Sequence, residues 1–273
     1  MKTGFVGGGH MGRALIAALR HSGVDAQTLF VAEPNAALRA ALAADFGIHV
    51  VSDAKEFIGD IECLVLAVKP QDMASVIAPL KSQLERSRPL VISIAAGLST
   101  SQLQRWCGVG VPVVRAMPNR PASLGAGASG LYADRSVSGA DRERAERVLS
   151  AAGMTVWVHE EQLMDVVTAL SGSGPAYFFK LAEALTDAAI LHGLDREAAA
   201  KLAAATLHGA GVMAATGEAM SELRNSVTSK GGTTAAALEA FANAGLDHIV
   251  ETAVAAAIER GRALSQQQDN TGG

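Results

Sequence analysis

The first 160 residues alternate between short apolar runs and stretches with helical character. The apolar runs include TGFVG, LFVAE, CLVLAV, PLVISIAA and PVVRAM, and the helical stretches between them lie at 11–21, 35–46, 71–84 and 100–106. Strands covered by helices on both faces are continuous apolar runs, so this pattern predicts a βαβ series around a mostly parallel sheet. The runs GASGLYAD and MTVWVH extend the sheet. We therefore expect a doubly wound, Rossmann-type α/β domain over residues 1–160.

After about residue 160 the strand signal stops and helix signals continue. Pro175 stands in the first turn of one predicted helix, and Asp195 can cap the next one. Either Thr233 or Thr234 can cap a later helix, which Gly245 ends. The remainder of the chain is therefore predicted to be all helical.

The chain ends in a last predicted helix and a polar tail. The helix covers roughly 247–266, and the tail SQQQDNTGG follows it. We expect an all-helical dimerisation and substrate-binding domain over 161–265 and a disordered tail over 266–273.

The helical part is more apolar than one chain can cover. Lys180, Glu183 and Asp187 are spaced i, i+3 and i+7, so they share one stripe of their helix and leave its other faces apolar. The segment KLAAATLHGAGVMAATG is rich in Ala and Gly, which lets helix axes approach closely. We expect this domain to pack against a second copy, giving a homodimer or a larger assembly. Packing against its own sheet domain alone is the alternative.

Composition excludes several classes of protein. A net charge of -4 and a pI of about 6.0 give no basic surface for nucleic acid. The longest apolar stretch, 202–215, contains Thr, His and Gly and falls short of a membrane span, so we expect no membrane partner and a cytoplasmic protein. Cys63 and Cys107 have no histidine partners at metal spacing, and no metal site is predicted.

A glycine-rich loop joins the first strand to the first helix. It reads Gly7-x-Gly9-x-x-Gly12, with His10 and Met11 at its centre. In a strand–turn–helix context, Gly7 makes the tight turn, Gly9 lets a pyrophosphate approach the backbone, and Gly12 lets helix and strand pack closely. The helix N-terminus presents free N–H groups to the phosphates. The loop therefore predicts a dinucleotide cofactor.

The choice between NADH and NADPH is open from the residues. Glu33 closes the second strand 21 residues after Gly12, where an acidic side chain accepts hydrogen bonds from a ribose 2′-hydroxyl and repels a 2′-phosphate. Glu33 alone favours NADH. Arg39 lies further along the next helix, where it is either a partner for the 2′-phosphate or part of a solvated helix face.

Three further strands end in segments expected to line the cofactor site, because ligands of open α/β sheets bind outside the carboxyl ends of the strands. The segments are AVKPQ, SIAAG and RAMPNRPA. The residues assigned to the cofactor are Ala67, Val68, Lys69, Pro70, Ala95, Ala96, Gly97 and Asn119.

Two C-terminal segments are similar to a known family. VTALSGSGPAYFFKLAEALTDAAILHGL and LRNSVTSKGGTTAAALEAF, together with MPN at 117–119 and the glycine loop, resemble pyrroline-5-carboxylate reductase. The resemblance implies a Rossmann domain followed by a helical dimerisation domain, with the active site between the cofactor edge and the helical domain. It also implies an interlocked dimer, often assembled into rings of dimers, and a common preference for NADPH. The chain departs from the family pattern at His10, Arg120 and Lys230, where the family usually has Asn, Thr and often Pro.

The polar loop VTSKGGTTAA suits the substrate that the resemblance implies, a cyclic imine with a carboxylate. Gly231 and Gly232 let the backbone expose N–H donors, Ser229 and Thr233 add hydroxyls, and the next helix N-terminus favours negative charge. By resemblance, Thr234 places its hydroxyl on the imine nitrogen and is the catalytic residue. The alternative is that both threonines serve only as N-caps.

The expected reaction is reduction of 1-pyrroline-5-carboxylate to L-proline by NADPH or NADH. A β-hydroxyacid dehydrogenase carries a helix lysine followed by asparagines, whereas Lys180 is followed by Glu183 and Ala184. An imine protonated by water accepts hydride without a strong general acid, so catalysis can be mostly positioning. The alternatives are a reductase of another cyclic imine carboxylate and a dinucleotide-binding redox sensor without turnover.

Overall fold

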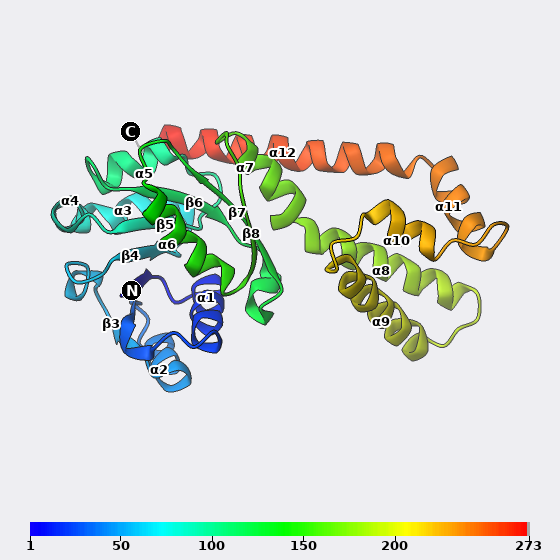
Figure 1. The fold of residues 1–273 in the computed structure, drawn as a ribbon, viewed down its shortest axis with the longest axis horizontal. Helices are drawn as coiled ribbons and strands as arrows, with labels where there is room; N and C mark the ends of the chain where they lie inside the picture. The colour runs from blue at the N-terminus through cyan, green and yellow to red at the C-terminus, as the bar shows by residue number, and fades with distance from the viewer. Residues whose placement is uncertain (272–273) are drawn as a thin grey trace. The chain divides into compact units, whose positions relative to one another are not determined.

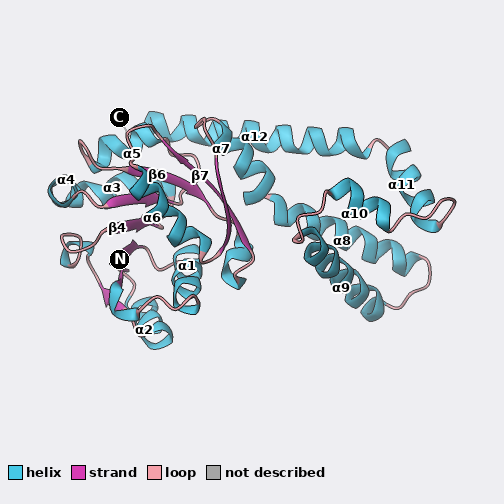
Figure 2. Cartoon of the chain, in the orientation of Figure 1, coloured by secondary structure: helices cyan, strands magenta, loops and turns pink. Residues whose placement is uncertain are grey.

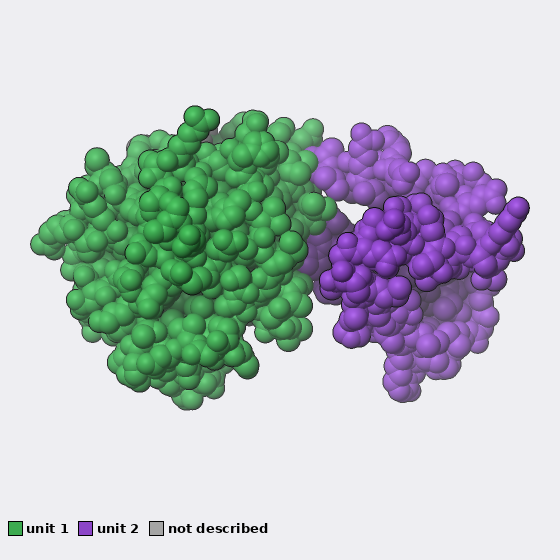
Figure 3. Space-filling view, viewed as in Figure 1, with its two compact units in different colours: residues 1–173, 257–273 green, residues 174–256 purple. Residues whose placement is uncertain are grey.

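The computed structural model describes the backbone of residues 1–271 and the side chains of residues 1–266. The chain forms two compact units, coloured separately in Figure 3. Unit 1 contains Met1–Ser173 and residues 257–271, and unit 2 contains Gly174–Ala256. Residues 161–173 therefore lie with the sheet, although the sequence groups them with the helical domain. Glu161 accepts a hydrogen bond from Arg115 of β6, and the carbonyl of Ser171 accepts one from Asn119, which follows β6; these bonds explain the placement.

Unit 1 is built on one eight-stranded sheet, shown in magenta in Figure 2, with strand order β3-β2-β1-β4-β5-β6-β7-β8. All neighbouring strands are parallel except β6 and β7, which are antiparallel. The strands are β1 Thr3–Val6, β2 Leu29–Ala32, β3 His49–Val51, β4 Cys63–Leu66, β5 Leu90–Ser93, β6 Val113–Met117, β7 Gly127–Ala133 and β8 Gly153–Trp157. Only the short β3 has no counterpart among the predicted runs.

Helices cover both faces of the sheet (Figure 1). They are α1 His10–His21, α2 Ala36–Phe46, α3 Met73–Ile77, α4 Lys81–Ser87, α5 Thr100–Cys107, α6 Gly139–Ser150 and α7 Leu163–Val167. Alternate strand residues enter separate cores: Phe5 packs with residues of α1 and α6, and Val6 packs with residues of α3, α4 and α5. The doubly wound α/β fold is thus confirmed. The expected single helix at 71–84 is wrong, because Pro79 lies in a 3₁₀ turn between α3 and α4, where it cannot donate a helical hydrogen bond.

Unit 2 consists of helices α8 Gly174–Leu191, α9 Arg196–Ala214, α10 Met220–Ser226 and α11 Thr233–Asn243, and of the first part of α12 Leu246–Thr271. Asp195 caps α9 as predicted, because its carboxylate accepts hydrogen bonds from the N–H groups of Glu197 and Ala198. The expectation that Thr233 or Thr234 caps α11 is wrong, since Gly232 occupies the N-cap position.

The C-terminal helix is longer than predicted. We expect the last helix to end near residue 266, whereas α12 continues to Thr271. No Gly or Pro stands between Gly261 and Thr271 to stop it, and glutamine is a good helix former. The last two residues of the predicted disordered tail, 272 and 273, lie outside the described residues. None of the described helices combines the length and apolar character that a bilayer crossing requires.

Unit 2 buries little of its own apolar surface. Of the residues from 174 to 256, all of which the structure describes, only Gly174 and Ala199 are fully buried. On α8, Phe178, Leu181 and Leu185 are 59%, 47% and 49% exposed, and their spacing of three and four residues places them on one face. We call these three residues the α8 stripe.

Candidate functional site: a glycine loop and a polar helix start

The glycine loop begins with a sharp turn at Gly7. Gly7 has a φ of 100°, and its N–H donates to the carbonyl of Ala32 over 2.9 Å. A Cβ at this position would lie 2.7 Å from the carbonyl oxygen of Ala67. Both the positive φ and the close approach require glycine, as the sequence predicts.

The rest of the loop leaves the start of α1 open. Gly9 is the N-cap of α1, so it has no side chain with which to cap the helix, and a Cβ added to it meets no atom within 4 Å. At Gly12, by contrast, a Cβ would lie 2.4 Å from the carbonyl oxygen of Gly7. His10 is exposed and Met11 half-buried on the first turn. Free space before uncapped helical N–H groups fits the pyrophosphate of a bound dinucleotide.

The change Gly9→Ala tests this assignment. Its φ of -66° suits alanine, and the space around the new methyl group is open, so we expect an unchanged melting temperature. The methyl group would occupy the approach to the backbone, so the dissociation constant for NADPH or NADH should rise about tenfold or more, ~1.4 kcal/mol. Isothermal titration calorimetry measures both affinities.

Gly139→Ala is the matched control, because a Cβ there also meets open space, at the start of α6. It should change neither the melting temperature nor the affinity. Wild-type affinity in Gly9→Ala would show that phosphates do not bind at this loop.

Glu33 follows β2 and is only 7% exposed. Its Oε2 accepts a hydrogen bond from the N–H of Gly8, and its Oε1 accepts one from the N–H of Asn35, each over 2.9 Å. The carboxylate is therefore bound to the glycine loop on one side and to the start of α2 on the other. Arg39, half-buried on α2, donates from Nη1 to the carbonyls of Glu33 and Pro34 over 2.8 and 2.7 Å.

The segments after β4 and β5 lie at the same edge of the sheet as the glycine loop, because β1, β4 and β5 are adjacent and parallel. The N–H of Ala67 donates to the carbonyl of Val6, which ties the two strand ends together. Gly97, with a φ of 77°, lies against Ser265 of α12. The structure thus brings together the predicted residues Ala67, Val68, Lys69, Pro70, Ala95, Ala96 and Gly97.

Asn119 follows β6, and both ends of its side-chain amide are bonded within the protein. Oδ1 accepts from the N–H of Ala128 over 2.9 Å, and Nδ2 donates to the carbonyl of Ser171 over 3.2 Å. Ser171 lies in a π-helical turn, Thr168–Gly172, between α7 and α8. Such turns are rare and frequently occur at functional sites. In this structure the amide of Asn119 holds that turn, while its assignment to the cofactor stays a prediction.

A partly buried ion pair beside these segments is absent from our sequence interpretation. Arg115 of β6 donates to Glu161 over 2.7 Å, and Glu161 also accepts from the N–H and the hydroxyl of Thr100 at the start of α5. Glu161 therefore fixes the end of the β5–α5 loop that carries Gly97. The available signal was Arg115 itself, since a charged residue within an apolar strand requires a partner.

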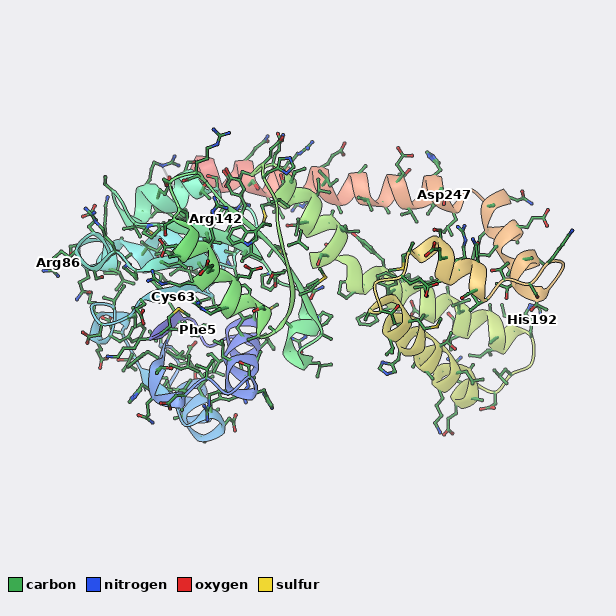
Figure 4. All side chains as sticks on the ribbon, viewed as in Figure 1. Phe5, Cys63, Arg86, Arg142, His192 and Asp247 are labelled. Carbon is green, nitrogen blue, oxygen red and sulfur yellow. The ribbon has the colours of Figure 1, made fainter. Side chains whose placement is uncertain are left out.

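Neither cysteine belongs to a reactive site. Burial raises the pKa of the Cys63 thiol, and it raises the pKa of the Cys107 thiol to about 12. Both thiols are protonated at neutral pH, so they are poor nucleophiles and poor metal ligands. Phe5 and Cys63, labelled in Figure 4, belong to the same buried cluster of unit 1. Within the described residues, no group of three or more His, Cys, Asp and Glu side chains could hold a metal ion.

The polar loop of unit 2 turns tightly before α11. Gly231 has a φ of 71°, and the N–H of Gly232 donates to the carbonyl of Ser229 over 3.0 Å. A Cβ on Gly232 would lie 2.3 Å from Oγ of Ser229, so the serine hydroxyl sits directly over the N-cap. Thr233 is exposed and Thr234 half-buried in the first turn of α11.

This geometry can hold an anion. The start of α11 has a glycine at its N-cap, so its first N–H groups are not capped by the N-cap side chain. The helix macrodipole adds partial positive charge there, and Ser229 places a hydroxyl beside these groups. The structure therefore brings together Ser229, Gly231, Gly232, Thr233 and Thr234, as the sequence predicts for a carboxylate site.

Comparison with known proteins identifies the family. Residues 161–264 match the family model for pyrroline-5-carboxylate reductase dimerisation, and residues 2–97 match one for coenzyme F420-dependent NADP oxidoreductases. The chain is 45% identical over 267 residues to pyrroline-5-carboxylate reductase of Pseudomonas aeruginosa, covering 97% of each protein. This chain belongs to the pyrroline-5-carboxylate reductase family.

Solved structures of pyrroline-5-carboxylate reductases have the same fold. The structure from Coxiella burnetii is 36% identical, with a TM-score of 0.93 over 96% of this chain and 98% of that one. The Plasmodium falciparum enzyme, solved with NADP bound, is 30% identical, with a TM-score of 0.82 over 97% of this chain and 98% of that one. These findings support a nicotinamide dinucleotide as the cofactor of this reductase.

Two of the unusual residues of this reductase lie near its two loops. His10 is exposed at the first position of α1, and Lys230 is exposed between Ser229 and Gly231. The third, Arg120, is an exposed residue that begins a 3₁₀ turn after Asn119. All three side chains therefore add positive or ionisable groups to accessible positions.

Proposed function

We propose that this chain reduces 1-pyrroline-5-carboxylate to L-proline and that the loop 229–234 binds the carboxylate of the imine. The observation that carries the proposal is the start of α11, where uncapped N–H groups, the Ser229 hydroxyl and the Thr234 hydroxyl occur within six consecutive residues. The names of the Pseudomonas aeruginosa and Coxiella burnetii relatives support this substrate.

The chain's own residues act by binding and orienting. The N–H groups of the first turn of α11 neutralise the substrate carboxylate, and Ser229 donates a further hydrogen bond to it. Thr234 then holds the imine nitrogen, which fixes the direction of the C=N bond. Correct alignment of this kind contributes up to ~7–11 kcal/mol to lowering a barrier.

A bound reduced nicotinamide dinucleotide supplies the hydride that the C=N carbon receives. The proton on nitrogen comes from water, so the reaction needs no acidic side chain from the protein. Lys180 is unsuited to act as a general base: its exposed ammonium donates to Glu183 over 2.7 Å, and this hydrogen bond raises the pKa of Lys180, so the side chain stays protonated. The glycine loop at Gly7–Gly12 holds the pyrophosphate of the cofactor in this proposal.

We further propose that the chain works as a homodimer assembled through unit 2. A unit with two fully buried residues and an exposed α8 stripe lacks an adequate core of its own. A second copy related by a two-fold axis would cover the same stripe on both chains. The family model that matches residues 161–264 describes a dimerisation domain, which supports this assembly.

The test is to follow oxidation of NADPH and of NADH by absorbance with racemic 1-pyrroline-5-carboxylate, and to identify the product by chiral chromatography. We expect oxidation that depends on the imine, with L-proline as the product.

Oxidation of neither cofactor would remove the proposal. Turnover with a different cyclic imine carboxylate alone would assign the site to that substrate. Cofactor binding with no turnover on any imine would instead indicate a redox sensor.

A further inference from the structure

We propose that Glu33 is a positioning residue that holds the glycine loop, and that Arg39 reads the 2′-phosphate and makes the chain prefer NADPH to NADH. This inference rests on the dinucleotide-binding part of the proposed function, and not on the identity of the imine. It differs from the usual role of an acidic residue after the second strand, which is to bind ribose hydroxyls.

The carboxylate of Glu33 is already engaged by the protein. One oxygen receives the N–H of Gly8 and the other receives the N–H of Asn35, and the residue is almost fully buried. Buried carboxylates need such donors, because desolvation without them is costly. The two bonds connect the residue that precedes Gly9 to the residue that caps α2.

Packing leaves no room for a side chain at Gly8. A Cβ on Gly8 would lie 2.5 Å from a methyl carbon of Leu42 and 3.4 Å from Oε2 of Glu33. Leu42 belongs to α2 and is buried, so a side chain at Gly8 would have to displace it. Gly8 therefore lies between α2 and the Glu33 carboxylate, and its N–H is held by that carboxylate one residue before Gly9, the N-cap of α1.

The consequence concerns both cofactors equally. NADH and NADPH have the same pyrophosphate, which the glycine loop binds. If Glu33 acts by holding that loop, its loss raises the dissociation constants of both cofactors by the same factor. If Glu33 acts by binding ribose hydroxyls, its loss weakens the binding of NADH and strengthens that of NADPH, because the 2′-phosphate is no longer repelled.

Arg39 is placed to distinguish NADPH from NADH. It is the only basic residue between 33 and 39, and its Nη1 is bonded to the carbonyls of Glu33 and Pro34, so the guanidinium is fixed at the end of β2. The ribose that carries the 2′-phosphate binds at this strand end in Rossmann folds. A planar, permanently charged guanidinium held in one place is well suited to bind a phosphate.

Two variants and two matched controls test the proposal by calorimetry with NADPH and NADH, without substrate. For Glu33→Gln we expect both dissociation constants to rise about tenfold, with their ratio changed less than about threefold. For Arg39→Met we expect the constant for NADPH to rise about thirtyfold and that for NADH less than about threefold. The fragments adenosine 2′,5′-bisphosphate and AMP should repeat the Arg39→Met difference.

Glu143→Gln on α6 and Arg86→Met on α4 make the same charge changes at exposed positions and should leave both constants unchanged. Arg86 lies at the outer edge of unit 1 in Figure 4. The fitted stoichiometry separates misfolding from positioning, because unfolded protein lowers the number of sites, whereas a displaced loop raises the dissociation constant.

Three results would overturn the inference. The first is a wild-type chain that binds NADH more tightly than NADPH. The others are a Glu33→Gln variant that binds NADH more weakly but NADPH more tightly, and an Arg39→Met variant in which both dissociation constants rise by the same factor. Because no imine is present, these outcomes are independent of whether the chain reduces 1-pyrroline-5-carboxylate.

Discussion

Replacing Thr234 with alanine is expected to lower kcat about 100-fold while the cofactor binds as before. In the proposed site the Thr234 hydroxyl contacts the imine nitrogen, where charge changes during hydride transfer. Removing one such donor from a preorganised site lowers kcat about 100-fold, which corresponds to a rise of ~2.7 kcal/mol in the activation barrier. Stopped-flow and steady-state kinetics with 1-pyrroline-5-carboxylate measure kcat, and calorimetry measures cofactor affinity.

The Thr234→Ala substitution should not destabilise the fold. Thr234 is half-buried in the first turn of α11, Gly232 and not Thr234 occupies the N-cap, and alanine is the better helix former. The melting temperature should therefore stay level or rise slightly. Thr234→Ser keeps the hydroxyl and should retain most of kcat. A Thr234→Ala variant that loses cofactor affinity at unchanged kcat would show that Thr234 does not belong to the substrate site.

The sheet and the glycine loop were predictable because their signals are local. Strands β1, β4 and β5 have side chains in cores on both faces, so each is a continuous apolar run. The spacing of Gly7, Gly9 and Gly12 reflects a backbone turn and a close helix–strand contact, both formed by residues next to one another in sequence. The α11 loop was recognisable for the same reason.

Long-range contacts account for what the sequence did not reveal. The bond from Gly8 to Glu33 joins residues 25 positions apart, and the bond from Asn119 to Ser171 joins residues 52 apart. Residue type and spacing suggested a ligand for both side chains, and the structure adds the bonds that each makes within the protein. Polar groups near a binding edge look alike in sequence whether they face a ligand or support the loop that does.

Replacing Leu181 with aspartate is expected to separate the assembly into single chains. Leu181 is the middle residue of the α8 stripe, between Phe178 and Leu185. Covering each large apolar side chain contributes roughly 1.5–3 kcal/mol, and a two-fold interface places every substitution at two positions. A buried, unpaired carboxylate adds a cost of several kcal/mol for each copy. Sedimentation velocity over a range of protein concentrations would measure the change in mass.

The separated chain should also lose stability, because unit 2 has almost no core of its own to retain. We expect a lower melting temperature and stronger binding of a hydrophobic dye. Lys180→Asp is the matched control: it introduces the same carboxylate one residue away, on the charged stripe with Glu183 and Asp187. That variant should sediment like the wild type. If Leu181→Asp also sedimented like the wild type, the α8 stripe would lie outside the contact between chains. Another surface of unit 2 would then have to form the dimer contact.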